Sequence, residues 1–404
     1  MTSLHSTSPA KIAWLQGLSL PSNWSESKVK YVAPGMQAGE AITAESIEPV
    51  GTYPVYGGNG LRGYTEAKTH HGTRILIGRQ GALCGNVHLV FGEFWASEHA
   101  IVARAADAVD SRWLAYLLHV MNLGQYSQTA AQPGIGTAQI NALPVPVPPL
   151  SEQRAIADYL DREVARIDTL IEEQQRLIEM LRERRTAVIA HATSQGADVE
   201  LRRVIAVLRQ GWSPNCESWP ADGVAEWGVL KVGCANTGRF DPAENKRLPD
   251  EETPRPELAV RQGELVMSRS NTKDLVGAAA VVDGSYPRLL LSDLTYGLSL
   301  TDDADPAFVA YALGSPGMRV QISAASKGMS HSMQKISQRD IRELRVRLPA
   351  LGEQRHVAAY LDGQTAKLDA LIAETERFIE LARERRAALI TASVTGQIDI
   401  REMA

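Results

Sequence analysis

Apolar residues recur at alternating spacings of three and four in two stretches of this chain. The first stretch contains Ile156, Leu160, Val164, Ile167, Ile171, Ile178, Leu181 and Val188, and the second contains Val357, Leu361, Leu368, Ile372, Ile379 and Leu389. This spacing keeps the apolar side chains on one face of an α-helix. We therefore predict helices over residues 152–189 and 353–390, each about 57 Å long at about 1.5 Å per residue. Helices of this length need a partner along the apolar face.

The two stretches are copies of one another. Residues 152–189 return 201 positions later as residues 353–390, with the same residue at 21 of 38 aligned positions and no gap. Polar residues interrupt both apolar faces at matching places, Gln174 with Thr375 and Arg185 with Arg386, which favours a single register. Because a parallel pair would force the chain between the helices to span their whole length, we predict that they lie antiparallel.

The predicted fold class is α+β: two globular α+β segments separated by two long helices that form an antiparallel coiled coil with pseudo-twofold symmetry. Prolines precede the helices and glycines follow them, as is usual at helix boundaries. The predicted segments are residues 1–148, 149–195, 196–348 and 349–393, with a tail over 394–404 that packs on the first globular segment.

The globular segments also resemble each other. Residues 72–90 and 263–282 both place a short apolar strand before an arginine, Arg79 or Arg269, in a polar turn. A glycine, Gly85 or Gly277, then opens another strand. The duplication therefore extends beyond the helices.

Composition adds limits to this description. The chain has 404 residues, of which 44% are apolar, and a formal net charge of −5, so any nucleic-acid binding must come from local patches. Its three cysteines, Cys84, Cys216 and Cys234, lack the spacing of a metal site or a disulfide framework. We expect a reducing cytoplasm, since neither an export signal nor an apolar stretch long enough to cross a membrane is visible.

The sequence lacks the common catalytic motifs. No phosphate-binding GxxxxGK[ST], no GxGxxG after a strand, no HExxH and no GxSxG is present. The pair His70 and His71 has no acidic or cysteine neighbour at ligand spacing, so we expect no metal site. We therefore predict that the chain has no catalytic activity of its own.

Polar clusters in predicted turns are the candidate binding residues. Arginine pairs with guanine, and asparagine or glutamine with adenine, so such clusters can read DNA bases; a solvated polar loop is the alternative for each. The glycine cluster at 57–60 is interpreted as a tight turn, with a loop lying against nucleic acid as the alternative. The candidate DNA-binding residues are Tyr56, Asn59, Arg62, Arg79, Gln80, Gln132, Gln139, Arg269, Asn271, Lys273, Lys327, His331, Gln334 and Lys335.

The arginine-rich ends of the helices, RERRTA and RERRAA, could also contact phosphates. Acidic residues interleave with the arginines, which favours a solvated face with charge pairs four residues apart. We therefore interpret the helices as surfaces for docking other proteins.

With these motifs, the sequence resembles the specificity subunit of type I restriction-modification systems over nearly its whole length. PVPPLSEQRAIADYLD and RLPALGEQRHVAAYLD are similar to the two openings of the family's central helices. WLQGLSLPSNW, PVYGGNG, WGVLKVG, ENKRLP and MSRSNT are similar to its target-recognition segments.

The resemblance implies two target-recognition domains, each reading one half of a bipartite, asymmetric site in double-stranded DNA through the major groove. Two modification subunits, which bind S-adenosylmethionine and methylate adenine at N6, would dock along the helices. Restriction subunits, acting as motor and nuclease, would consume ATP with Mg²⁺, and this chain would hold no cofactor. The implied partner-binding residues are Glu152, Gln153, Arg154, Tyr159, Glu353, Gln354, Arg355 and Tyr360.

Three alternatives remain open: a coiled-coil scaffold that binds no DNA, an enzyme of unknown type, and a specificity subunit serving a combined nuclease-methylase.

The two helices differ at one place, because Gly363 and Thr365 stand where the first copy has Arg162 and Val164. An interior glycine weakens a helix by about 1 kcal/mol. The departure therefore indicates a kink or a docking contact.

Overall fold

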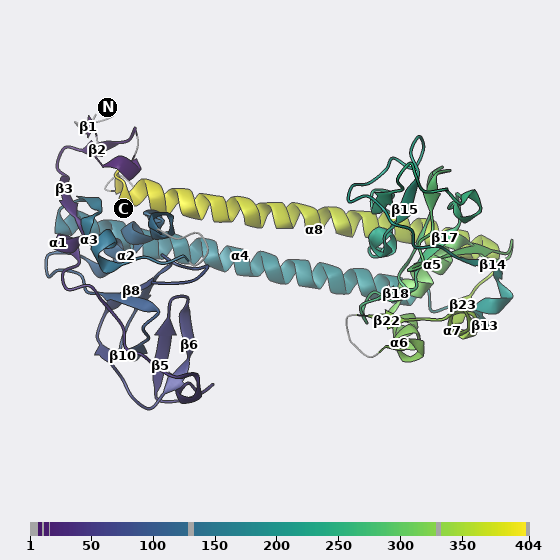
Figure 1. Cartoon of the computed structure of the whole chain (residues 1–404), viewed down its shortest axis with the longest axis horizontal. Coiled ribbons are helices and arrows are strands. Elements are labelled where there is room, and N and C mark those ends of the chain that lie inside the picture. Colours follow the sequence, from purple (N-terminus) through teal and green to yellow (C-terminus); the bar gives the residue numbers. More distant parts are fainter. Residues whose placement is uncertain (1–6, 10–11, 16, 128–132, 329–332, 401–404) are drawn as a thin grey trace. The chain divides into compact units, whose positions relative to one another are not determined.

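The computed structural model describes residues 7–9, 12–15, 17–127, 133–328 and 333–400. They form two compact units: unit 1 contains residues 1–174 and 377–404, and unit 2 contains residues 175–376. Each unit has a globular α+β segment and part of two long helices, α4 (Leu150–Ala192) and α8 (Leu351–Val394), as Figure 1 shows. The predicted α+β class with two packed long helices is confirmed. Each compact unit combines a globular segment with helix, whereas the sequence-based ranges set the helices apart.

Unit 1 contains short strands and three short helices besides its share of α4 and α8. The strands are β1 (Thr7–Pro9), β2 (Ser19–Pro21), β3 (Ser25–Lys28), β4 (Gln37–Ala38), β5 (Tyr53–Gly57), β6 (Gly60–Thr65), β7 (His70–His71), β8 (Arg74–Gly78), β9 (Val87–Val90), β10 (Glu93–Ala96), β11 (Ala100–Ala103) and β12 (Pro144–Val147). The short helices are α1 (Val29–Val32), α2 (Ser111–Val120) and α3 (Thr137–Ala142).

Unit 2 contains a similar set of strands and short helices. Its strands are β13 (Ala197–Glu200), β14 (Ile205–Gln210), β15 (Gly228–Leu230), β16 (Asn245–Arg247), β17 (Leu265–Ser268), β18 (Ser270–Asn271), β19 (Ala279–Val281), β20 (Leu289–Leu290), β21 (Thr295–Leu300), β22 (Gln334–Lys335) and β23 (Arg345–Leu348). Its short helices are α5 (Pro306–Gly314), α6 (Pro316–Ala325) and α7 (Gln338–Glu343).

The main sheets of the two units share one arrangement. Unit 1 orders its strands β4-β11-β8-β9, and unit 2 orders its strands β14-β21-β17-β19. The central strands, β8 and β17, are buried on both faces and carry continuous apolar residues, as expected for strands covered on both sides. Each unit also has a second small sheet with one parallel pair, β5 with β10 and β15 with β20. The duplication inferred from the sequence therefore includes the sheets.

The long helices pair antiparallel within each unit. In unit 2, Arg182 of α4 bonds Glu376 of α8 at 3.1 Å, and Arg185, further along α4, bonds Asp369, further back along α8, at 3.1 Å. In unit 1, Asp168 of α4 bonds Arg386 of α8 at 3.0 Å. In these pairs the residue numbers rise along α4 as they fall along α8, so the helices are antiparallel, as predicted. These charge pairs run across the two helices.

The apolar face of each helix shifts slightly along its length. Most predicted seam residues of α4, from Ile156 to Ile178, are buried. Near the end, however, Ile189 is buried and the predicted Val188 is only half-buried, and α8 repeats this with Ile390 and Leu389. The cause is the helical period of 3.6 residues, which drifts by about 20° per heptad from a strict 3.5-residue pattern.

A buried glutamine joins each globular segment to the start of a long helix. In unit 1, the Gln153 amide accepts a hydrogen bond from the Asp110 backbone N–H at 2.9 Å and donates to the Pro148 carbonyl at 2.9 Å. In unit 2, Gln354 accepts from the Asp305 N–H at 2.8 Å and donates to the Pro349 carbonyl at 2.9 Å. Each amide bonds both the N-cap residue of a short helix and the proline segment. It therefore fixes how these two segments meet.

A tight turn that requires glycine recurs beside each central strand. Gly85 and Gly277 have φ of 88° and 74°, in the region that side chains rarely adopt. A Cβ at Gly85 would lie 2.1 Å from the Gly124 nitrogen. Both glycines therefore serve the turn that the sequence pattern predicted.

The end of the chain packs on unit 1. Val394, Ile398 and Ile400 lie in the same apolar cluster as the start of α4, and Gln397 donates to the Ser19 carbonyl at 3.0 Å (Figure 1). In the part of the chain that the structure describes, no helix combines the length and apolarity needed to cross a membrane.

Replacing Gln153 with alanine should destabilise the protein by about 2 kcal/mol, because it leaves a buried N–H and a buried carbonyl without partners. Urea denaturation measures this change. The matched control is Arg154→Ala at the exposed neighbouring position, which should change the free energy of unfolding by less than about 0.5 kcal/mol. An equal effect for both variants would contradict the structural role of Gln153.

Candidate nucleic-acid interface

The two predicted polar clusters of unit 2 come together in the structure. Residues 270–271 form β18 and pair antiparallel with residues 334–335 of β22, so that Asn271 lies opposite Gln334 and Ser270 lies opposite Lys335. Lys327 pairs with Lys335 in an isolated bridge. Side chains more than 50 residues apart in the sequence therefore share one surface, next to Arg269.

Arg269 is held by the turn on which it lies. Its backbone N–H donates to the Leu294 carbonyl at 2.8 Å, and its carbonyl accepts from the Ile336 N–H at 3.0 Å. One guanidinium N–H donates to the Asp293 carbonyl at 2.9 Å and the group also has the Tyr296 side chain as a partner, which orients it while part of its five donors stays available. The half-buried guanidinium is thus positioned by the fold.

Arg79 in unit 1 makes an equivalent set of hydrogen bonds. Its N–H donates to the His99 carbonyl at 2.8 Å, its carbonyl accepts from Ile135, and its guanidinium donates to the Glu98 carbonyl at 3.4 Å. Gln80, exposed beside it, forms a bridge with Gly134. Arg79 and Arg269 are therefore equivalent residues, as the sequence pattern predicted.

Three lysines give the unit 2 surface its charge. Lys273, Lys327 and Lys335 are all exposed, and among the described residues none of them forms a salt bridge. Together with Arg269 they make a local basic patch in a chain of net charge −5. Such a patch suits a phosphate backbone, which attracts unpaired cations.

The hairpin of β5 and β6 positions the remaining candidates of unit 1. Gly57 pairs with Gly60, so residues 58–59 form a two-residue loop, and the tight-turn interpretation is confirmed. Arg62 is exposed on β6, while Asn59 accepts a hydrogen bond from Asn86 at 3.2 Å. Tyr56 is half-buried, with its ring edge-on to Phe94 at a centroid distance of 5.7 Å. Of these side chains, Arg62 is the one best placed to reach a ligand.

Two candidates have structural contacts that sequence reasoning could not foresee. Gln139 accepts from the Gly136 N–H at 2.7 Å and donates to the Tyr126 carbonyl at 3.3 Å, so it holds the start of α3. Asn271 donates to Asn236 at 3.0 Å. Asn236 was not predicted, because it lies 35 residues away and only the fold brings it to the patch. Gln132 and His331 lie outside the described residues.

The predicted partner-binding residues divide by exposure. Gln153 and Gln354 are buried and fully engaged inside their units, and the Glu152 carboxylate accepts from Asn23 and Trp24 at 2.9 Å each, which gives these three residues structural roles. Tyr159 is half-buried beneath the Arg162 guanidinium. The exposed members are Arg154, Glu353, Arg355 and Tyr360.

The fold thus defines a duplicated α+β protein with an equivalent arginine turn in each half. Residues 21–180 match the family described as the type I restriction modification DNA specificity domain. The specificity subunit of the type I restriction enzyme EcoprrI from Escherichia coli is 44% identical over 131 residues, which cover 31% of this chain and 33% of that protein. That of EcoKI, from Escherichia coli K12, is 21% identical over 348 residues, which cover 81% of this chain and 73% of that protein.

The alignments with the first curated relatives span about a third of the length of those proteins. A chain solved in a study of complex assembly and conformational transition of the type I R-M system has a TM-score of 0.72 at 15% identity, covering 94% of this chain and 100% of that one. The HsdS subunit from Thermoanaerobacter tengcongensis has a TM-score of 0.54 at 16% identity, covering 95% and 99%. These two likenesses establish the fold. The family and curated matches show that parts of this chain are similar to type I restriction-modification specificity subunits.

Unit 1 should lose stability in mild acid because of His88, which lies beside Gly60 under the hairpin. Burial lowers the pKa of His88 below its usual 6.5, and nearby His119 lowers it further. The unfolded chain therefore binds the proton first, so the stabilisation is complete above pH 6.5 and declines as the pH falls below it. Urea denaturation at about pH 5 and about pH 8 tests this, since His88→Gln should show a smaller loss between the two. An unchanged loss would contradict the assignment.

Proposed function

We propose that this chain selects the DNA sequence for a type I restriction-modification complex, with each globular segment reading one half of a bipartite site. The observation that carries the proposal is the repeated turn of Arg79 and Arg269. Each guanidinium is oriented by one carbonyl and keeps donors for a base edge, and guanine is the base that arginine reads most often. Two equivalent arginine turns with different neighbouring residues suit the reading of two different half-sites.

Phosphate contacts would come from the basic patch of unit 2 and from Arg62 of unit 1. The exposed lysines Lys273, Lys327 and Lys335 lie on or next to the paired strands β18 and β22 that follow Arg269, so they would set the position of the duplex while the arginine sets the sequence. Because the chain is acidic as a whole, tight binding would depend on partner subunits that close around the DNA.

The partners we propose are modification and restriction subunits. Large apolar side chains are exposed on the helices: Leu170, Phe378 and Leu381 in unit 1, and Tyr360, Leu371 and Met180 in unit 2. Exposed apolar residues that gather on one element mark surfaces that other proteins cover. S-adenosylmethionine, ATP and Mg²⁺ would belong to the partner subunits, in the cytoplasm, and this chain would contribute no catalytic group.

Replacing Arg269 with alanine should relax or abolish recognition of one half-site while the other half stays intact. A bidentate arginine contact discriminates between bases by about 1–3 kcal/mol, so selectivity at that half should fall by about tenfold to a hundredfold. Mapping N6-methyladenine in host DNA, with the partner genes present, measures the change.

The matched control is Arg79→Ala, which loses an equivalent carbonyl contact and should affect the opposite half-site. If both variants weakened both halves equally, the cause would be general destabilisation. If the parent chain gave no sequence-selective methylation with its partners, the scaffold alternative would stand instead.

Shortening both helices by one heptad should shorten the spacer between the half-sites. Deleting residues 174–180 and 375–381 removes Glu376, the partner of Arg182, but leaves the Asp168–Arg386 and Arg185–Asp369 pairs, so each unit keeps one charge pair between the helices. Seven residues of helix correspond to about 10 Å. This length equals about three base pairs of DNA.

Methylation of a library of sites with varied spacers measures this change. Repeating both heptads instead of deleting them provides the control and should lengthen the preferred spacer. An unchanged spacer in both variants would refute the role of the helices in spacing, without affecting the proposed role of Arg269.

A further inference from the structure

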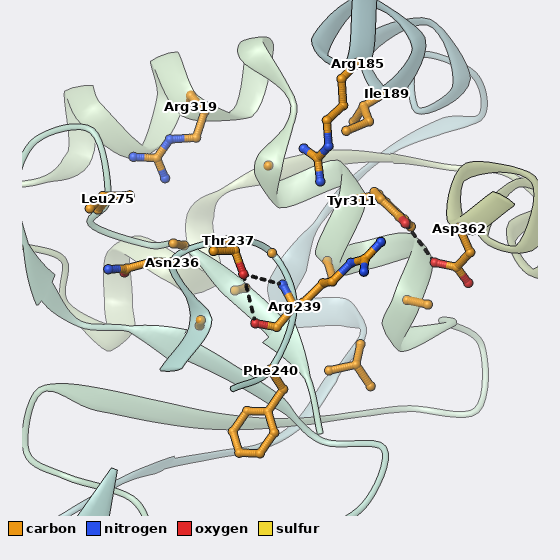
Figure 2. A pocket seen from close by; sticks show the side chains of 18 of the residues that line it. Arg185, Ile189, Asn236, Thr237, Arg239, Phe240, Leu275, Tyr311, Arg319 and Asp362 are labelled. Atoms are coloured by element: carbon orange, nitrogen blue, oxygen red, sulfur yellow. Dashed lines mark hydrogen bonds between the residues drawn. The ribbon is translucent and has the colours of Figure 1, made fainter. Parts of the chain in front are cut away.

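Unit 2 contains a cavity of about 590 Å³ that is lined by residues of this unit alone. This volume lies within the range of about 300–1,000 Å³ that is usual for ligand pockets. Small residues of α5 and β19 line it, including Ala307, Ala310, Gly314 and Ala279. Figure 2 shows Arg185, Arg239, Tyr311 and Asp362 around the same space.

In unit 1, the corresponding helix is tied to α4 by a guanidinium group. Arg112 of α2 bonds Asp158 at 2.7 Å and Asp161 at 2.9 Å, and Tyr116 donates to Asp161 at 2.8 Å. We call this contact of Arg112 with the two carboxylates the arginine tie. It closes the space between α2 and the long helix.

Shared hydrogen bonds establish which residues of unit 2 are equivalent. Tyr311 of α5 donates to Asp362 at 2.7 Å, as Tyr116 does to Asp161. Asp305 is the N-cap residue of α5 and bonds Gln354, as Asp110 is the N-cap residue of α2 and bonds Gln153. The tyrosine and its carboxylate are therefore retained in both units.

The arginine tie, in contrast, is absent from unit 2. The 195-residue offset of the tyrosines places Ala307 at the position of Arg112, and the 201-residue offset of the long helices places Ala359 at that of Asp158. Gly314 stands in place of His119, and a Cβ built there meets no atom within 4 Å. Each replacement shortens a side chain, and two of the shortened residues, Ala307 and Gly314, line the cavity.

The strand that packs on α5 also carries shorter side chains than its counterpart in unit 1. Val87 and Leu89 of β9 pair with Ile77 and Ile75, while Ala279 and Val281 of β19 pair with Met267 and Leu265 at the matching positions. Shortening buried side chains costs stability when the space stays empty. A set of such changes around one space suggests that something fills it in the working complex.

The charges around the cavity indicate what that occupant carries. Arg185 and Arg239 both bond Asp369, at 3.1 and 3.3 Å, and the Arg319 guanidinium donates to three backbone carbonyls. The three lining carboxylates, of Asp274, Asp283 and Asp362, form no salt bridge among the described residues. The lining thus holds as many arginines as aspartates, and Asp362 is the carboxylate whose counterpart in unit 1, Asp161, has a guanidinium partner.

We propose that the cavity of unit 2 receives an arginine- or lysine-bearing segment of a partner protein subunit, whose cation bonds Asp362 as the Arg112 guanidinium bonds Asp161 in unit 1. Apolar side chains of that segment would pack against the alanines that line the cavity. The inference rests on the proposed function for the identity of the partner, which we take to be the modification subunit.

The double substitution Ala307→Arg and Ala359→Asp tests the proposal in the full chain, because it rebuilds the arginine tie and fills the cavity. The melting temperature should equal or exceed that of the parent. The Kd for the purified modification subunit, measured by calorimetry without DNA, should rise by about tenfold or more, since a hydrogen bond to a charged group contributes about 1.5–3 kcal/mol. An unchanged Kd in a folded variant would overturn the proposal.

Asp362→Asn provides a second variant if the double substitution fails to fold. It keeps an acceptor for Tyr311 but removes the charge, so it should raise the same Kd; no change would count against the proposal. The matched control in unit 1 is Arg112→Ala with Asp158→Ala, which should destabilise the chain and leave the Kd within about twofold of the parent.

A photo-crosslinking residue at position 310 identifies the occupant. Crosslinks to a modification-subunit peptide that contains arginine or lysine would support the proposal, whereas crosslinks to DNA alone, or none, would overturn it. Because these measurements report association, they can fail while Arg269→Ala still alters one half-site, and the proposed reading of DNA would then stand.

Discussion

The apolar seam between α4 and α8 has to stay buried, and two arginines within it restrict how the helices can pair. Arg185 bonds Asp369 in unit 2, and Arg386 bonds Asp168 in unit 1. Partly exposed pairs of this kind contribute only about 0–1 kcal/mol each, so the apolar contacts must supply most of the stability. The charge pairs instead disfavour slipped registers, in which a guanidinium would face apolar residues without a carboxylate.

This register matters because each globular segment is attached where a long helix begins. Gln153 and Gln354 bond both the proline segment before the helix and the N-cap residue of a short helix in the globular segment. The arginine turn then follows from the main sheet, whose central strand leads directly to Arg79 or Arg269. A chain of buried contacts therefore connects the helix seam of each unit to the residue proposed to read a base.

The two units keep this framework and differ in what surrounds it. Unit 1 closes the space between its short helix and α4 with the arginine tie, while unit 2 has alanines at the corresponding positions and a cavity. Thr365, which departs from the repeat, is buried and its hydroxyl lies 3.1 Å from that of Tyr311, while α8 continues unbroken through Gly363. Divergence after duplication has thus altered packing beside the helices more than the helices themselves.

The sequence alone predicted the long helices, their antiparallel pairing and the duplicated strands, because helical periodicity, the internal repeat and the length of the connecting segment can all be read along the chain. It also predicted the equivalence of Arg79 and Arg269. Only the tertiary structure decided that Gln153 and Gln139 hold the fold together, that Asn236 joins the basic patch, and that unit 2 has a cavity. These features depend on hydrogen bonds and packing between residues far apart in the chain, and a single sequence carries no local signal for such contacts.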